Sequence, residues 1–105
     1  MTHPTSALDE VVHQRVRLGI LAVLAEARRA DFTFLRNSLE LSDGNLSRHL
    51  QVLEAAGYVS IAKEFEGRRP RTWVQATPAG RQAFYGELAA LQALLDRISS
   101  QRRNP

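Results

Sequence analysis

The N-terminal part of the chain carries apolar residues at helical spacing. Between Leu8 and Ala27 they recur every three or four positions, and this period predicts an amphipathic helix over 8–27. The acidic pair 9–10 suits the start of this helix and the arginine pair 28–29 its end, because a helix dipole favours acids near its N-terminus and bases near its C-terminus. The predicted inward stripe consists of Val12, Val16, Ile20, Leu24 and Ala27.

Two shorter helices are predicted next, joined by a tight turn at Leu41–Ser42. Residues 31–33 are long enough only for a bridging strand, and Thr33 can cap a helix over Phe34–Glu40. Ser42 can cap a second helix over Asp43–Ala56. The inward stripe of this second helix is Leu46, Leu50 and Leu53, and Gly57 follows where a left-handed C-terminal cap is expected. The pair has the lengths and spacing of a helix-turn-helix.

After Gly57 the apolar period changes from helical to alternating. Val59, Ile61 and Phe65 alternate with polar or small residues, and a second β-rich run contains Trp73 and Val74. The segment 66–70 between them predicts the basic tip of a hairpin. Thr77-Pro78 then provides an N-cap followed by proline at the first helical position, and a long helix is predicted over 78–98.

The predicted element order is helix, short strand, helix, helix, strand, strand, helix. This is a mainly α fold with a small β-hairpin, in the α+β class, and its order is that of a winged helix-turn-helix. We expect one domain over 8–98, with a C-terminal dimerisation helix over 78–98. Residues 1–7 and 99–105 are polar and without periodicity, so flexible termini are expected there.

Composition narrows the function classes further. The 105 residues, 44% hydrophobic and 24% charged, suit one small globular domain. The absence of cysteine excludes disulfides, cysteine-based metal sites and thiol nucleophiles, and it suits a reducing cytoplasm. The longest apolar stretch, 18–25, is too short to cross a bilayer, and the N-terminus lacks the pattern of an export signal, so a cytoplasmic protein with no membrane partner is expected.

The net charge of +3 is modest, but almost all of the cations are arginines. Lys63 is the single lysine. The planar guanidinium suits phosphates and guanine edges, although a GC-rich genome would also favour arginine over lysine. The positions of the arginines therefore carry more information than their number.

The outward face of the predicted 43–56 helix carries side chains that read bases. Asparagine and glutamine pair with adenine, arginine with guanine, and serine with base edges or phosphate. A solvated polar face is the alternative, but such a face would be rich in glutamate and lysine pairs, and this one is not. The candidate reading residues are Asp43, Asn45, Ser47, Arg48 and Gln51.

The hairpin gives independent support for an anionic partner. Arg68, Arg69 and Arg71 crowd around Gly67 and Pro70, and like charges on a turn repel each other unless an anion neutralises them. A loop that is simply solvated is the alternative interpretation. Together with the polar helix face, the hairpin predicts a basic wing beside a recognition surface.

The stretch from Ser42 to Phe84, SDGNLSRHLQVLEAAGYVSIAKEFEGRRPRTWVQATPAGRQAF, resembles the core of small winged-helix DNA-binding regulators related to the MarR and ArsR groups. The SDGNLSRHL helix, the LEAAGYV junction, the GRRPRT wing and the TPAGR helix start occur in the order of that family. With HQRVRLGILAVL in the first helix, the resemblance covers roughly 8–98.

This resemblance implies a dimeric transcription factor whose third helix enters the major groove while the wing contacts the backbone or the minor groove. It places Asp43, Asn45, Ser47 and Arg48 at the major groove, Thr33 and Arg36 near phosphates, and Arg68–Arg71 in the wing. The metal-sensing relatives use cysteines or clustered histidines. Here the histidines are scattered at positions 3, 13 and 49, so neither a metal site nor a cofactor is expected.

His49 and the last helix each have two interpretations. His49 is expected beside the recognition surface, where phosphate contact and packing are equally plausible. In the last helix, apolar residues at spacings of 4, 3, 4 and 3 form a short heptad seam that predicts a homodimer, although the seam could instead pack on its own domain. The seam consists of Phe84, Leu88, Leu91, Leu95 and Ile98.

The sequence thus predicts a homodimer that binds double-stranded DNA sequence-specifically and regulates transcription, most simply as a repressor by occlusion. The alternative is a winged helix that serves as a protein-interaction module. Catalysis is not expected, because no nucleophile and base stand at motif spacing. A small-molecule effector that binds between the dimer helices and the DNA lobes is compatible with the sequence.

Overall fold

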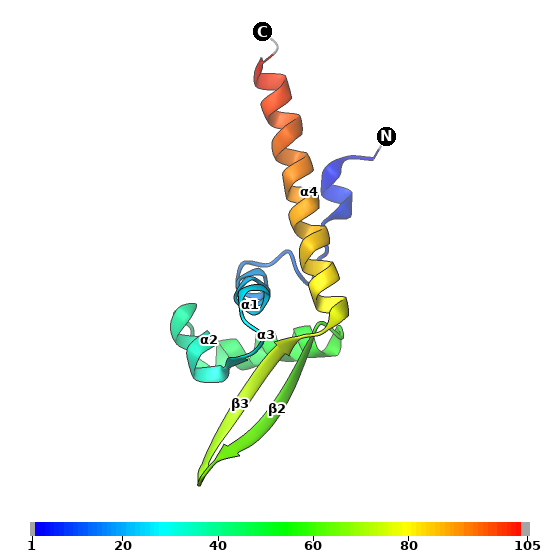
Figure 1. Cartoon of the computed structure of the whole chain (residues 1–105). Helices are drawn as coiled ribbons and strands as arrows, with labels where there is room; N and C mark the ends of the chain where they lie inside the picture. Colours follow the sequence, from blue (N-terminus) through cyan, green and yellow to red (C-terminus); the bar gives the residue numbers. More distant parts are fainter. Residues whose placement is uncertain (1, 104–105) are drawn as a thin grey trace.

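The computed structural model describes residues 2–103 and shows a winged helix in the α+β class (Figure 1). Three antiparallel strands form a sheet in the order β1-β3-β2. The elements in chain order are η1 (Pro4–Ala7), α1 (Arg15–Glu26), β1 (Ala30–Asp31), α2 (Phe32–Ser38), α3 (Asp43–Ala55), β2 (Val59–Glu66), β3 (Arg69–Ala76) and α4 (Pro78–Arg103).

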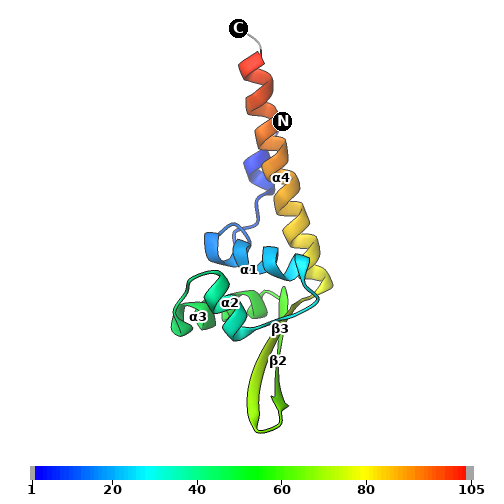
Figure 2. The same ribbon diagram turned by 60° about the vertical axis from the view of Figure 1, so that its left-hand side comes forward.

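The helices α1, α2 and α3 pack with the base of the sheet around one core, from which two elements extend in opposite directions. The β2–β3 hairpin, here called the wing, extends from one end of the body, and the C-terminal half of α4 extends from the other (Figures 1 and 2). The molecule is correspondingly long, with principal extents of 64 × 24 × 22 Å. The most deeply buried apolar side chains belong to Val12, Ile20, Leu21, Leu35, Leu46, Leu53 and Val74.

The first helix is shorter than predicted, because the chain breaks at Gln14. Gln14 has extended backbone angles, and its side chain accepts hydrogen bonds from the backbone N–H groups of Val16 and Arg17, which caps α1 at Arg15. The preceding residues form a separate turn around Asp9, whose carboxylate accepts from two backbone N–H groups and from the Tyr58 hydroxyl at 2.6 Å. Val12 is buried in the core although it precedes α1. The apolar pattern therefore does not reveal the break, which is why the sequence predicts one continuous helix.

The cap of α2 is also different from the prediction. Asp31 and not Thr33 is the N-cap, since its Oδ1 accepts from the backbone N–H of Phe34 at 2.7 Å. The helix accordingly begins at Phe32, and Thr33 is an exposed residue within its first turn. Aspartate is at least as good an N-cap as threonine, so both residues were suited to the role.

The caps of α3 are confirmed. Ser42 Oγ accepts from the backbone N–H of Asn45 at 3.1 Å. At the other end Gly57 has a φ of 79°, and Tyr58 N donates to Leu53 O at 2.9 Å, which is the hydrogen bond of a Schellman motif. The recognition helix of the helix-turn-helix is thereby fixed at both ends.

The wing has a tighter tip than the predicted 66–70 turn. Glu66 pairs with Arg69, so only Gly67 and Arg68 connect the strands, and Gly67 has the positive φ, 64°, that the first position of a type II′ turn requires. Pro70 lies within β3, opposite Phe65. The short β1 reaches β3 only at Trp73 and Val74, so the missing N–H of the proline lies beyond the part of β3 that pairs with β1.

The chain ends are more regular than the flexible termini that the sequence predicted. Residues 4–7 form η1, which packs beside α4, and α4 continues past Ile98 to Arg103. The predicted start of α4 is confirmed, since Thr77 Oγ1 accepts from Gly80 N at 3.0 Å and donates to Gly57 O at 2.6 Å. Within residues 2–103 no helix is long and apolar enough to span a membrane.

Candidate nucleic-acid interface

The α3 helix presents the predicted polar face to solvent. Its opposite face is buried and includes Leu46, Leu50 and Leu53. Because the leucines fix the rotation of the helix about its own axis, the other face points away from the core. The exposed side chains on this face are those of Asp43, Asn45, Ser47, Arg48 and Gln51.

Two polar contacts order the side chains at the N-terminal half of α3. Arg48 Nη2 donates to Asn45 Oδ1 at 2.8 Å, so the two groups proposed to read bases already face each other. Arg36 of α2 forms an ion pair with Asp43 at 2.8 Å, which links the two helices of the helix-turn-helix. Both contacts leave side-chain donors free to face a ligand, because a guanidinium carries five N–H groups.

The structure corrects the placement of His49, which is buried and not on the recognition surface. Only 7% of the residue is exposed, and Arg17 Nη1 donates to His49 Nδ1 at 3.1 Å, so this ring nitrogen accepts. Burial lowers the pKa of His49, and the charges of Arg17 and Arg48 lower it further. His49 is therefore neutral near pH 7 and supplies no positive charge for a phosphate.

The three arginines of the wing divide into two kinds. Arg68 and Arg69 are exposed at the tip, and within residues 2–103 neither takes part in an ion pair. Arg71 lies further along β3, with Nη1 3.0 Å from Asp31 Oδ2 and Nε 3.3 Å from Glu66 Oε2. The tip arginines are thus available to an anion, whereas Arg71 already has two carboxylate partners.

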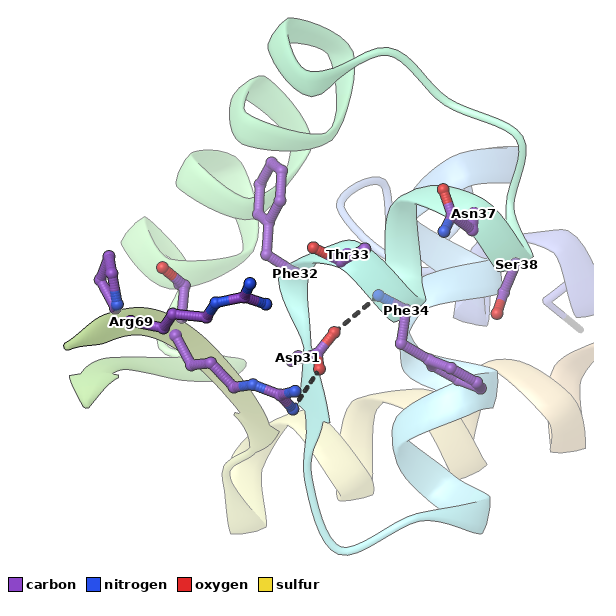
Figure 3. Close-up of a pocket in the computed structure, with 10 residues that line it drawn as sticks. Asp31, Phe32, Thr33, Phe34, Asn37, Ser38 and Arg69 are labelled. Atoms are coloured by element: carbon purple, nitrogen blue, oxygen red, sulfur yellow. Dashed lines mark hydrogen bonds and ion pairs between the residues drawn. The ribbon is translucent and has the colours of Figure 1, made fainter. Parts of the chain in front are cut away.

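A groove of about 860 Å³ separates the wing from the start of α2. Figure 3 shows Arg69 reaching into it from the wing side, Asp31 at its centre and Phe34 on the α2 side. The same groove brings Thr33 close to the wing. Its lining residues are Asp31, Phe32, Thr33, Phe34, Asn37, Ser38, Arg69, Pro70, Arg71 and Thr72.

Sequence reasoning missed a set of contacts that hold the base of the wing. The guanidinium carbon of Arg29 lies 3.8 Å from the centre of the Trp73 ring, and Arg29 Nη1 is 3.0 Å from Glu64 Oε2. The sequence pattern places Arg29 at the C-terminal end of the first helix and Asp31 in a bridging strand, and it indicates no partner for either side chain. These partners are distant in sequence, and the pairing of both β1 and β2 with β3 brings them together.

The predicted seam on α4 is divided between the core and the surface. Phe84 is only 7% exposed and belongs to the core of its own domain, which corrects its assignment to a dimer interface. Leu91 is partly buried. Leu88, Leu95 and Ile98 are 41%, 60% and 50% exposed, and Tyr85 beside them is 55% exposed. A row of apolar side chains along a projecting helix is typical of an interaction surface.

The helix-turn-helix, the three-stranded sheet and the basic wing define the winged helix class of DNA-binding proteins. The chain belongs to the winged helix DNA-binding domain family, whose sequence pattern matches residues 16–95. This membership confirms the fold and the regulator family that the sequence predicted.

Relatives of known structure and sequence agree with this membership. The structure of a transcriptional regulator homologue from Pyrococcus horikoshii OT3 is similar, with a TM-score of 0.85 and 33% identity over 93% of this chain and 98% of that one. The uncharacterized protein MJ0432 of Methanocaldococcus jannaschii is 37% identical over 71% of this chain and 82% of its own length. Regulators of the MarR and PadR families also share the fold.

A transcriptional regulator from M. tuberculosis, MOSR, has been solved in complex with DNA. Its TM-score to this chain is 0.69 with 18% identity, and the match covers 92% of this chain and 69% of that one. This similarity shows a common fold.

Proposed function

We propose that the protein is a homodimeric transcriptional regulator that binds double-stranded DNA sequence-specifically. The observation that carries the proposal is the exposed polar face of α3 beside a wing tip with two arginines that have no ion-pair partner among residues 2–103. In this proposal α3 enters the major groove, where Asp43, Asn45, Ser47, Arg48 and Gln51 reach base edges. The protein acts by binding and not by catalysis.

Phosphate contacts position the protein on the duplex. We assign these contacts to Arg68 and Arg69 of the wing tip and to Thr33 and Arg36 of α2. Arg36 also forms the ion pair with Asp43 at 2.8 Å, and this contact holds its guanidinium at the edge of α3. A dimer that covers its operator blocks other proteins from the same DNA, and we therefore propose repression by occlusion.

The dimer is proposed to form through the exposed apolar row of α4. Leu88, Leu95 and Ile98 remain uncovered within one chain, and a second copy of the same helix offers the same apolar surface. Two-fold symmetry places two recognition helices on the DNA about one turn apart, so we expect an inverted repeat with centres about 10 bp apart.

The direct test is selection of bound duplexes from a random library, followed by titration of the selected sequence. We expect recovery of an inverted repeat and salt-dependent binding to random duplex as well. A winged helix that serves only as a protein-interaction module would recover no motif and would show no salt-dependent DNA binding.

Removing the readers on α3 is expected to relax specificity. Each of Arg48→Ala and Asn45→Ala should reduce discrimination at one operator base pair by about 1–3 kcal/mol, with a smaller change in affinity for random duplex. Glu54→Ala is the control, because Glu54 is exposed in the last turn of the same helix, beyond the proposed reading residues. If both variants rank operator mutants as the wild type does, α3 is not the reader.

Removing the wing-tip charge is expected to weaken binding to all sequences alike. Arg68→Ala and Arg69→Ala should each lower the slope of log K against log salt concentration by about 1, because each removes one phosphate contact. Arg97→Ala removes the same charge from the α4 helix, far from the wing, and should leave the slope unchanged (Figure 1). An unchanged slope in the wing variants would show that the tip points away from DNA.

A further inference from the structure

Arg71 is held from both sides of the strand that carries it. On one side its Nη1 lies 3.0 Å from Asp31 Oδ2, at the end of β1. On the other side its Nε lies 3.3 Å from Glu66 Oε2, at the end of β2. Its guanidinium carbon is also 5.7 Å from the centre of the Trp73 ring. We call Asp31, Glu66 and Arg71 the Arg71 cluster.

The Arg71 cluster has the wrong charge to attract a phosphate. Two carboxylates and one guanidinium give a formal charge of −1, although the cluster lies directly behind the two arginines of the tip. A phosphate that approached Arg71 would meet the carboxylates of Asp31 and Glu66 at the same place. The cluster therefore neutralises a cation that the sequence alone would count as part of the basic wing.

Asp31 is the fixed member of the cluster. Its Oδ1 accepts from the backbone N–H of Phe34 at 2.7 Å and caps α2, while its Oδ2 binds Arg71 (Figure 3). The side chain of Asp31 is only 20% exposed, whereas that of Glu66 is 58% exposed. The body of the domain thus positions the carboxylate, and the carboxylate positions the arginine.

We propose that Asp31 is a positioning residue that withholds Arg71 from the DNA backbone. It limits the phosphate contacts of the wing to Arg68 and Arg69, which keeps the sequence-independent part of the affinity low. This inference rests on the proposed function, and it goes beyond that function because it assigns opposite roles to arginines that stand two and three positions apart.

The variant that tests the proposal is Asp31→Asn, because asparagine keeps the N-cap of α2 but loses the charge that holds Arg71. We expect tighter binding to random duplex and a salt slope that is steeper by about 1, since Arg71 gains a phosphate. An increase from 50 to 200 mM salt should then weaken D31N about three- to fourfold more than the wild type. The emission of Trp73, the single tryptophan, should change without DNA, because Arg71 leaves its surroundings.

A double-mutant cycle separates the release of Arg71 from the general effect of removing one negative charge. Arg71→Gln alone should leave the salt slope unchanged, whereas Arg69→Gln, the matched control on the same strand, should lower it by about 1. In D31N/R71Q the slope should return to that of R71Q. Circular dichroism and thermal unfolding show whether each variant is folded.

Three results would overturn the proposal. The first is a wild-type slope in folded D31N, and the second is an equal steepening in the R71Q background, which would indicate a long-range field effect. The third is a lower slope in R71Q alone, which would show that Arg71 contacts a phosphate in the wild type. These outcomes differ from failure of the proposed function, in which the wild type binds no duplex at any salt concentration.

Discussion

Leu95→Asp is expected to convert the protein from a dimer to a monomer. Leu95 is 60% exposed in the single chain, so an aspartate there costs the fold of one chain little. In the proposed dimer the same change buries a carboxylate from each chain in an apolar interface, where the desolvation cost exceeds what the seam contributes. Operator affinity should fall by about 10²- to 10⁴-fold, because the two recognition helices no longer bind as one unit.

Sedimentation and operator titration at moderate salt measure this result, and Ala93→Asp is the control. Ala93 is also exposed on α4, but its helical position lies away from the row of Leu88, Leu95 and Ile98. A93D should remain dimeric and bind normally. A dimeric L95D with normal affinity would exclude the exposed row as the interface and would direct attention to the N-terminal segment beside α4.

Gly80→Ala is expected to destabilise the protein strongly, although alanine has a higher helix propensity than glycine. A Cβ at position 80 would lie 2.0 Å from the carbonyl oxygen of Tyr58 and 2.8 Å from its carbonyl carbon. Both atoms belong to the backbone and cannot rotate away. Helix propensity favours alanine by about 1 kcal/mol, but forced overpacking against backbone should cost at least about 3 kcal/mol.

Gly86→Ala provides the matched control within the same helix. A Cβ at position 86 meets no atom within 4 Å, so propensity alone should act and stabilise the fold by up to about 1 kcal/mol. In urea, G80A should lower the unfolding midpoint by about 1–3 M, while G86A should raise it slightly. Equal midpoints for the two variants would show that the start of α4 can move away from Tyr58.

The sequence predicted elements whose signals are local. The caps at Ser42, Gly57 and Thr77 each include a hydrogen bond that spans three residues, so their residue types identified them. The polar face of α3 followed from the leucine stripe by helical geometry. The same helical geometry predicts that His49 is buried. His49 lies three residues after Leu46 and four before Leu53, which places it on the buried side of α3.

The remaining features depend on contacts between distant residues. Arg71 and Asp31 are 40 residues apart, and no local pattern distinguished Arg71 from Arg68 or Arg69. Phe84 fits the heptad spacing, but it is buried in its own domain, and the row becomes exposed only from Leu88 onward. Which part of α4 packs on the domain depends on tertiary contacts that the spacing does not contain. The role of each wing arginine in DNA binding stays a prediction.

The first turn of α4 is tied to the end of α3 by the Thr77 hydroxyl and by the bond from Thr77 N to Tyr58 O at 3.0 Å. From there α4 runs unbroken for 26 residues, a length of about 39 Å. In the proposed dimer α4 acts as a rigid lever. The recognition helix is attached at its N-terminal end, and the partner helix is contacted toward its C-terminal end. A change of about 5° in the angle at which the two α4 helices cross would shift the recognition helix α3 by about 3 Å, which is one nucleotide step along a DNA strand. The crossing angle between the two long helices would therefore set which half-site spacing the protein accepts.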